Sequence, residues 1–231
     1  MLEKFNKPII GSGFLASNLK KYVKYLKKYK ITIYAAGISN SLEINQVNLN
    51  REILKIKKFI KINKKKLVYI STYSVCDESR KGKLYVKNKI KIEKIIKKTC
   101  KNYIIIRLPE IIGKNNNSST LTNFLFKKIK NKKSFILYRN VRRNLLDVDD
   151  ALYNCIKVIK SNLKKNKTIN LLNKRFYTPL TIVKMLEKIL HIKGLYKVKY
   201  IENNSFNLKD NYLINFKKDY LKKILRKYYK R

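Results

Sequence analysis

Short apolar runs alternate with longer amphipathic segments along the chain. Runs with apolar residues at consecutive positions predict buried strands, and they occupy residues 8–10, 31–36, 67–71, 103–107 and 168–172. Segments with apolar residues three or four positions apart predict helices, and they occupy residues 18–30, 44–61, 85–100, 121–129, 149–160 and 181–190, with a last lysine-rich helix after residue 216. This alternation predicts an α/β fold, doubly wound around a mainly parallel sheet.

The size and composition of the chain limit its class. A chain of 231 residues is long enough for one well-formed core and a small additional lobe, and 45% hydrophobic residues exclude a disordered chain. Lysines interrupt every apolar segment before the roughly 18 residues of a membrane span, and the first residues do not resemble a signal peptide. Cys76, Cys100 and Cys155 fit neither a disulfide framework nor a zinc site. These features predict a cytoplasmic location.

The formal net charge of +43 has two interpretations. A strongly basic surface favours binding to nucleic acid or another polyanion. However, the sequence is rich in Lys, Asn, Ile, Tyr and Phe together, which is the joint bias expected of an A/T-rich coding sequence, and its lysines are spread along the whole chain. We therefore expect only non-specific attraction to nucleic acid, and a surface that suits an anionic, phosphate-bearing substrate.

The segment GSGFLASNL, residues 11–19, lies between a predicted strand and a predicted helix. Gly11, Gly13 and Ala16 follow the spacing G-x-G-x-x-A. In such a turn the first glycine permits a tight bend, the second lets a pyrophosphate approach the backbone, and the third small residue lets helix and strand pack closely. A plain strand-to-helix turn would also use glycines, but this context favours a phosphate site at the helix N-terminus. The acidic residue expected about 20 positions further on, which would hold the adenosine ribose, is absent from TIYAAGISNS, residues 32–41.

Tyr85 and Lys89 lie four positions apart in a predicted helix, so they share one face. A tyrosine is a poor base at neutral pH, but a nearby ammonium stabilises the phenolate form. The segment STYSV, residues 71–75, directly follows the strand predicted at 67–71, and a Ser or Thr hydroxyl there would hold a substrate oxygen beside the tyrosine. The same spacing recurs at Tyr153 and Lys157, and in a chain so rich in tyrosine and lysine the spacing alone is weak. Because no hydroxyl-bearing strand precedes Tyr153, we interpret that second match as ordinary helix.

The order of the motifs resembles that of one family. The glycine turn is followed by AAG, VYIST, the Tyr-x-x-x-Lys pair, IIIRLPEIIG and RNLLDVDD. This order is similar to that of the extended short-chain dehydrogenase/reductase superfamily and, within it, to the NAD-dependent epimerase/dehydratase family, which remodels nucleotide sugars. The resemblance implies a Rossmann-like fold with an NAD(P)-binding domain at residues 1–172, to which 109–145 add a substrate side, and a small C-terminal substrate lobe at 173–231.

The resemblance also implies a role for each matching residue. Thr72, Tyr85 and Lys89 would be catalytic, with Tyr85 as the acid/base and Lys89 also binding the nicotinamide ribose. The cofactor, NAD or NADP, would be bound by Gly11, Gly13, Phe14, Leu15, Ala35, Ala36, Gly37, Asn48, Lys89, Pro109 and Glu110. The substrate would be bound by Ser39, Asn40, Arg143 and Asp149. An N-cap role for Asp149 is an equal alternative.

The sequence departs from the family pattern on the adenosine side. The helix after the glycine turn leads straight into ITIYAAG, residues 31–37, which matches the family's fourth strand rather than its second. One strand–helix–strand unit is therefore missing, together with the ribose-binding acid. Because that acid would exclude a 2′-phosphate, its loss makes NADP as suitable as NAD. The glycine spacing is also one residue tighter than the family's usual G-x-x-G-x-x-G, and Cys76 stands where the family often has tyrosine.

The remaining candidates favour structural roles. His191 follows a helix, and we expect it at the surface or at the helix C-terminus. Cys76 is expected to pack in the core rather than act as a nucleophile. Asp147, Asp149 and Asp150 have no other ligand cluster nearby and predict no metal site.

Taken with the resemblance, these features predict an NAD(P)-dependent enzyme of nucleotide-sugar metabolism. It would be a 4-keto-sugar reductase or an epimerase, in surface polysaccharide precursor synthesis. Two alternatives stay open. The missing unit favours a dinucleotide-binding protein without turnover, and the charge alone favours a nucleic-acid-binding member of the fold. The family also suggests a homodimer paired through helices 44–61 and 85–100.

Overall fold

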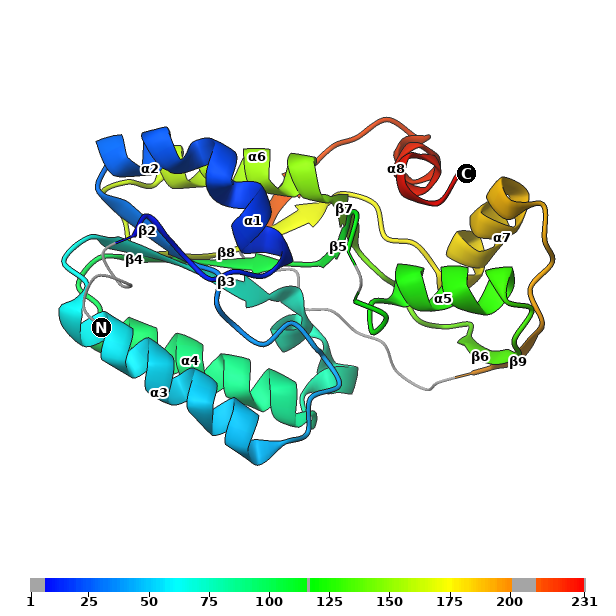
Figure 1. Ribbon diagram of the computed structural model, residues 1–231, viewed down its shortest axis with the longest axis horizontal. Helices are drawn as coiled ribbons and strands as arrows, with labels where there is room; N and C mark the ends of the chain where they lie inside the picture. The colour runs from blue at the N-terminus through cyan, green and yellow to red at the C-terminus, as the bar shows by residue number, and fades with distance from the viewer. Residues whose placement is uncertain (1–6, 116, 201–210, 231) are drawn as a thin grey trace.

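The computed structural model describes residues 7–115, 117–200 and 211–230 (Figure 1). Within these residues the central sheet has six strands in the order β1-β2-β3-β4-β8-β10, and every neighbouring pair is parallel. The strands are β1 (Ile9–Ile10), β2 (Ile31–Tyr34), β3 (Lys66–Thr72), β4 (Tyr103–Leu108), β8 (Lys167–Asn173) and β10 (Asn211–Ile214). The predicted Rossmann-like, mainly parallel α/β fold is thereby confirmed.

Helices cover both faces of this sheet (Figure 1). One face carries α1 (Phe14–Leu19), α2 (Val23–Lys28) and α6 (Val148–Ser161), and the other carries α3 (Gln46–Ile62) and α4 (Leu84–Thr99). Successive strand residues point to opposite faces, so neighbours in sequence enter different cores. Val68 packs in the core beneath α1, α2 and α6, whereas Tyr69 packs in the core with α3 and α4. This alternation is why the strands are apolar throughout.

The first helical region begins earlier than residue 18, where the sequence pattern placed it. It starts at Phe14, directly after Gly13, and a 3-10 turn at Lys20–Tyr22 separates α1 from α2. Ala16 and Leu19 are three positions apart and both buried. The apolar face of the helix therefore extends back to the glycine turn.

A second lobe lies beside the carboxyl ends of the strands (Figure 1). It contains α5 (Leu121–Lys130), α7 (Pro179–Leu190) and α8 (Tyr220–Tyr229), with two parallel strand pairs, β5 (Glu110–Ile112) with β7 (Leu145–Asp147) and β6 (Phe135–Tyr138) with β9 (Tyr196–Lys199). Its apolar core is formed by side chains such as Leu125, Ile182, Leu186, Leu221 and Leu225. The predicted substrate side at 109–145 thus supplies part of this lobe's core.

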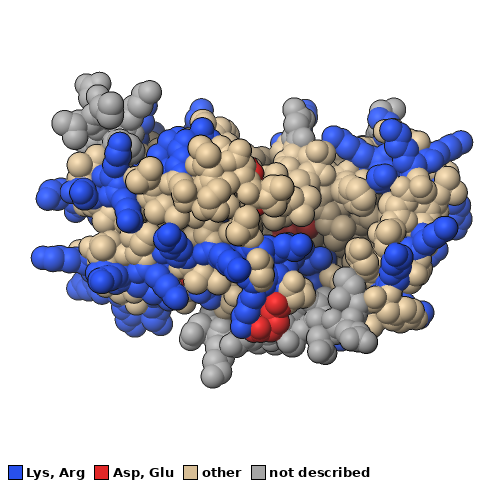
Figure 2. All heavy atoms as spheres, turned by 90° about the horizontal axis from the view of Figure 1, so that it is seen from below, with Lys and Arg blue, Asp and Glu red and all other residues tan. Residues whose placement is uncertain are grey.

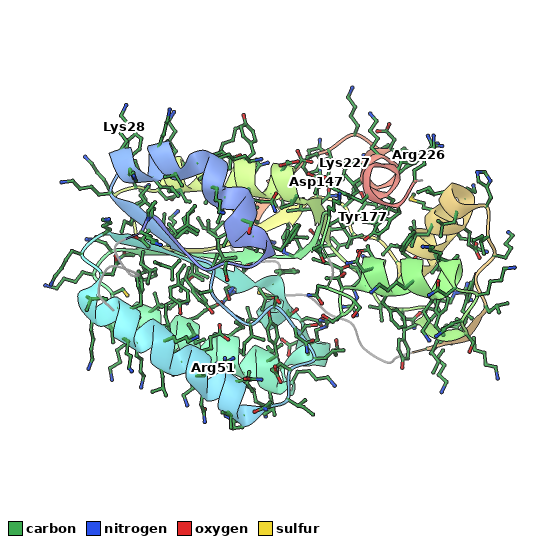
Figure 3. All side chains as sticks on the ribbon, in the orientation of Figure 1. Lys28, Arg51, Asp147, Tyr177, Arg226 and Lys227 are labelled. Atoms are coloured by element: carbon green, nitrogen blue, oxygen red, sulfur yellow. The ribbon has the colours of Figure 1, made fainter. Side chains whose placement is uncertain are left out.

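Residues 173–231, which the resemblance assigns to a small C-terminal lobe, also contribute a strand to the central sheet. Asn211–Ile214 return to the central sheet as β10 and pair with β8. This pairing covers the hydrogen-bonding edge that β8 would otherwise expose. The chain then crosses back as α8, and Figure 3 labels Lys227 of this helix near Asp147. Lys227 Nζ and the Tyr228 hydroxyl donate hydrogen bonds to the buried Asp147 carboxylate at 3.0 and 2.8 Å.

β1 lies at the opposite edge of the sheet and pairs with β2 alone. In the described part of the chain, no strand lies beyond it. This arrangement agrees with the missing strand–helix–strand unit inferred from ITIYAAG. No helix among the described residues is long and apolar enough to cross a membrane.

Basic side chains are distributed over both lobes. Figure 2 shows lysine and arginine scattered across one face of the molecule rather than gathered on one element. A duplex-binding surface needs a stripe or patch of positive charge. On the face shown, the charge does not form such a stripe.

Candidate active site

A cleft of about 810 Å³ lies at the carboxyl ends of the central strands. One wall follows the ends of β1 to β4 and includes Gly11, Ala35, Thr72 and Pro109, together with Tyr85 and Lys89 from α4; the other wall comes from the second lobe, at residues 117–121, 124 and 142–144. Ligands of open parallel sheets bind in this position. The topology therefore brings the separate sequence motifs to one place.

The glycine turn forms one end of the cleft. Gly11 has φ +132°, and a Cβ there would lie 2.6 Å from the Ala35 carbonyl oxygen. Gly11 is therefore required by the fold itself. A Cβ at Gly13, in contrast, would meet nothing within 4 Å, so the backbone at this position is open to the cleft. This open backbone at the start of α1 fits a phosphate group, and Phe14 and Leu15 line the cleft beside it.

The three predicted catalytic residues all line the same cleft. Thr72 is the last residue of β3, and its hydroxyl accepts a hydrogen bond from Ser74 N at 3.2 Å. Tyr85 and Lys89 lie one turn apart in α4, and Lys89 Nζ is 5.4 Å from the centre of the Tyr85 ring. This arrangement places an ammonium beside a phenol at the wall of a ligand-sized cleft, as acid/base chemistry at a hydroxyl group requires.

Lys89 has a partner that the sequence reading missed. Its Nζ lies 2.6 Å from Oε1 of Glu52, a buried residue of α3. A signal for Glu52 was present in the sequence. Glu52 lies on the same helix face as Leu49, Ile53 and Ile56, which are all buried, and a carboxylate within an apolar stripe needs a buried partner.

Most of the predicted cofactor residues line the cleft. They are Gly11, Gly13, Phe14, Leu15, Ala35, Ala36, Gly37, Lys89, Pro109 and Glu110. The Glu110 carboxylate is also used within the fold, because it accepts a hydrogen bond from Thr122 N at 3.0 Å at the start of α5. Asn48 does not line the cleft; its side-chain amide donates to Glu43 at 3.2 Å. The α3 residue that reaches Lys89 lies one turn later, at Glu52.

Arg143 is accompanied by a second arginine that the sequence reading did not single out. Arg143 and Arg80 both line the cleft, and both lie near Asp77 Oδ2, at 3.7 and 3.5 Å. Burial, together with the positive charge of Arg80, lowers the pKa of Arg143 to about 10. Two guanidinium groups that share one carboxylate provide an environment suited to an additional anion.

The other predicted substrate residues differ in their placement. Ser39 lines the cleft, whereas Asn40 does not, and the Asn40 side chain accepts a hydrogen bond from Leu42 N. Asp149 lies outside the cleft, where it pairs with Lys21 and Lys227 at 2.6 and 3.1 Å. The cap of α6 is Asp147 rather than Asp149, because Asp147 Oδ1 accepts from Asp149 N at 2.8 Å.

Cys76, His191 and Tyr153, for which the sequence favours structural roles, all lie outside the cleft. Cys76 is buried outside the cleft, where burial raises the pKa of its thiol and the Arg107 guanidinium partly offsets that rise. His191 ends α7 in the left-handed conformation, φ +55°. Tyr153 is 53% exposed on α6, outside the cleft. The described residues contain no group of three His, Cys, Asp or Glu side chains that could hold a metal ion.

Comparisons with solved structures agree with this fold. The solved structure of UDP-N-acetylglucosamine 4-epimerase from Bacillus cereus is similar, with TM-score 0.62 and 15% identity over 93% of this chain and 91% of that one. UDP-glucuronic acid 4-epimerase from Bacillus cereus in complex with NAD has TM-score 0.60 and 18% identity over 81% and 67%. UDP-glucose 4-epimerase from Thermus thermophilus in complex with NAD has TM-score 0.59 and 10% identity over 84% and 71%. At these identities the likeness establishes the fold.

The sequence itself identifies the family. A search of curated proteins found no match. The profile of the NAD dependent epimerase/dehydratase family, however, matches residues 38–171, which is more than half of the chain and includes Thr72, Tyr85 and Lys89. The protein therefore belongs to the NAD-dependent epimerase/dehydratase family.

Proposed function

We propose that this protein is an NAD(P)-dependent enzyme that changes the oxidation state or configuration of a sugar carbon in a nucleotide sugar. One observation supports this proposal most strongly: the cleft wall that contains the glycine turn also contains Thr72, Tyr85 and Lys89. Any one of these features has a structural explanation. Their convergence in one cleft, in a member of this family, supports a catalytic one.

The residues have distinct roles in this proposal. The open backbone at Gly13 would receive the pyrophosphate, and Lys89 would bind the nicotinamide ribose. When bound, the dinucleotide supplies or accepts a hydride. Tyr85 would move the proton of the sugar hydroxyl, and the Thr72 hydroxyl would hold that oxygen beside the Tyr85 phenol.

The substrate end of the cleft supports an anionic substrate. Arg80 and Arg143 lie there with Asp77 as a shared counter-ion, and Arg142 also lines the cleft. A nucleoside diphosphate carries the negative charge that such a group of arginines binds. The similar solved structures include 4-epimerases named for UDP-sugars, which is the substrate class we propose for this chain.

Between the two reactions, we place reduction of a 4-keto sugar ahead of epimerisation. An epimerase returns the hydride it removes and keeps its cofactor through many turnovers. A reductase must release the oxidised cofactor after every turnover, which a weaker grip allows. The edge position of β1 favours the weaker grip, as does the absence of an acidic residue among those that line the cleft from the loop between β2 and α3.

The same two observations support a second candidate, a dinucleotide-binding protein without turnover. Such a protein would keep the glycine turn but would have no use for a tyrosine beside an ammonium. The presence of Thr72, Tyr85 and Lys89 in one cleft is why we place it second.

One experiment separates these candidates. The protein is titrated with NADH and NADPH, then incubated with a panel of nucleotide sugars and nucleotide-4-keto-sugars, and Tyr85→Phe is compared with the parent. We expect binding of at least one dinucleotide and turnover that depends on Tyr85. Binding without turnover on any substrate would favour the second candidate, and absence of dinucleotide binding would overturn both.

The biological setting extends this proposal. The product would enter surface polysaccharide synthesis in the cytoplasm, and the protein would pair with a second copy through α3 and α4. Val47 and Leu54 on α3 are 74% and 58% exposed, which suits such a helix pairing.

A further inference from the structure

Lys89 and Glu52 form an ion pair at the back of the cleft wall. Their side chains are 3% and 2% exposed, and the Nζ–Oε1 distance is 2.6 Å. Lys89 lines the cleft, whereas Glu52 does not. Because Glu52 belongs to α3 and Lys89 to α4, the pair joins the two helices directly behind the proposed catalytic residues.

The Glu52 carboxylate is held from several directions. Besides Lys89, it accepts a hydrogen bond from Asn88 Nδ2 at 3.1 Å and one from the Tyr69 hydroxyl at 3.4 Å. These partners come from α4 and β3, and Glu52 itself is anchored in α3. A carboxylate held by two helices and a strand has little freedom, so it restricts the ammonium that it binds.

The backbone of Gly37 packs directly against the Lys89–Glu52 ion pair. A Cβ at Gly37 would lie 2.5 Å from Lys89 Nζ and 2.8 Å from Glu52 Oε1. The pair therefore packs against the bare backbone of the loop after β2. Lys89 has three N–H donors, of which Glu52 and Tyr69 engage two within the described part of the chain. One donor remains for a ligand in the cleft.

We propose that Glu52 is a positioning residue of the active site, which holds the Lys89 ammonium at the cleft wall where it meets the nicotinamide half of the dinucleotide. The identity of the ligand rests on the proposed function, whereas the hold of Glu52 on Lys89 does not. A buried ammonium without a counter-ion either loses its proton or turns toward water. Neutralising Glu52 should therefore release Lys89 and leave the glycine turn intact.

The first test measures the accessibility of Lys89 in the ligand-free protein. Lysine amines are labelled with acetic anhydride, and the rate at each lysine is followed by mass spectrometry in the parent, Glu52→Gln and Glu187→Gln. Glu187 is a matched control because it is a buried carboxylate on α7, in the other lobe. We expect labelling of Lys89 to accelerate about tenfold or more in Glu52→Gln alone. Lys66, on β3, should keep its parent rate in all three proteins.

The second test compares two ligands by calorimetry. In the proposed binding mode, ADP would end at the glycine turn, whereas NADH would extend to Lys89. We expect Glu52→Gln to weaken NADH binding about tenfold, the loss expected for a misplaced charged hydrogen bond, and to leave ADP binding within about twofold. A general loss of structure would weaken both ligands equally.

The outcomes separate this inference from the proposed function. Unchanged labelling of Lys89 in Glu52→Gln overturns the inference, as does faster labelling with unchanged NADH affinity. If the parent binds neither NADH nor NADPH, the proposed function fails, and the labelling rates alone decide whether Glu52 holds Lys89. If Glu52→Gln does not fold, Glu52→Asp replaces it, because a carboxylate one methylene shorter keeps the charge but loosens the pair. We then expect an intermediate rise in the labelling rate of Lys89. An unchanged rate would contradict the inference.

Discussion

The half of the cleft that holds Thr72, Tyr85 and Lys89 lies over interior strands, whereas the glycine turn lies at the edge of the sheet. Thr72 ends β3, which pairs with β2 on one side and β4 on the other. The glycine turn follows β1, which spans Ile9–Ile10 and pairs with β2 alone. Thr72, which would act on the sugar, therefore ends an interior strand. The glycine turn, which would hold the pyrophosphate of the dinucleotide, follows an edge strand.

Two ion pairs show the same contrast. Lys89–Glu52 and Lys21–Asp149 both have an N–O distance of 2.6 Å. The first pair is almost fully buried, while the side chains of the second, which joins the helical region after the glycine turn to α6, are 47% and 51% exposed. Water screens the exposed pair and leaves it a small net contribution, whereas removal of one partner from the buried pair leaves an uncompensated charge. The two pairs have the same N–O distance, but loss of one partner should cost more stability in the buried pair than in the exposed pair.

The two ends of the cleft are therefore anchored to different degrees in this family member. Among the residues proposed for proton transfer, Lys89 is held by the buried Glu52, whereas the glycine turn proposed to hold the cofactor follows a strand at the sheet edge. Reactivity and cofactor selectivity should therefore respond to mutation separately.

The largest expected effect is at Tyr85. Tyr85→Phe removes the proton-transferring hydroxyl, so turnover of a nucleotide sugar should fall by about 10²- to 10⁴-fold, measured as initial rates with saturating dinucleotide. Tyr153→Phe is the matched control, since Tyr153 has the same spacing to a lysine but is exposed on α6. Equal turnover of parent and Tyr85→Phe would place the chemistry elsewhere.

The glycine turn allows folding and binding to be separated. Gly11→Ala introduces a Cβ at φ +132°, 2.6 Å from a carbonyl oxygen, and should lower the free energy of unfolding by about 1–3 kcal/mol. Gly13→Ala meets nothing within 4 Å, so its urea unfolding should match the parent within about 0.5 kcal/mol. Its dinucleotide affinity should nevertheless fall about tenfold, because the new methyl group occupies the space the pyrophosphate would approach.

The control for both variants is Gly82→Ala, where a Cβ also meets nothing within 4 Å and Gly82 does not line the cleft. This variant should change neither unfolding nor binding. Full dinucleotide affinity in Gly13→Ala would show that the phosphates bind elsewhere.

Cofactor selectivity should be weak. Among the described residues, the acidic side chains that line the cleft are Asp77 and Glu110, and neither belongs to the loop between β2 and α3, whose Glu43 does not line the cleft. Without an acid there to repel a 2′-phosphate, the dissociation constants of NADH and NADPH should agree within about tenfold, or 1.4 kcal/mol. Calorimetric titration of both ligands measures this ratio. A preference for NADH above about a hundredfold would show that another group holds the adenosine ribose.

The smallest expected effect concerns the exposed pair. Hydrogen bonds from Lys21 and Lys227 hold the pKa of Asp149 below its ordinary value of 3.8. The unfolded chain then binds a proton more readily than the folded one, so this stabilisation is present above about pH 4 and is lost as the pH falls through the lowered pKa. Asp149→Asn should therefore cost less than about 1 kcal/mol at pH 6 and nothing at the lowest pH at which the protein folds. Urea unfolding at both pH values checks this, and an equal cost at both would contradict it.

The sequence predicted the larger elements well because their signals are local. Helices α3 and α4 and strands β3 and β4 were predicted to within two residues at each end. The short strands of the second lobe were missed, because strands of three or four residues carry almost no periodicity and form only when a distant partner pairs with them. β10 was missed for the same reason, since it exists through its pairing with β8.

Side-chain partners were harder to predict than elements. Asp147 and Asp149 are two positions apart, and either could have capped α6. In the structure Asp147 is the N-cap. Its second oxygen accepts hydrogen bonds from Lys227 and Tyr228 of α8, about 80 residues away in the sequence. Glu52 carried a recognisable anomaly, a carboxylate on an apolar helix face, but its partner Lys89 lies on a different helix.

The alternation of strands and helices, the glycine turn and the Tyr85–Lys89 spacing can all be read from the amino-acid sequence, because each depends on neighbours within a few residues. Tertiary structure alone decided that Thr72, Tyr85 and Lys89 share one cleft with the turn, that β1 lies at the sheet edge, and that Glu52 reaches Lys89. These features depend on contacts between distant segments. A local pattern records which side chains are available for such contacts, but only packing selects the partner each one receives.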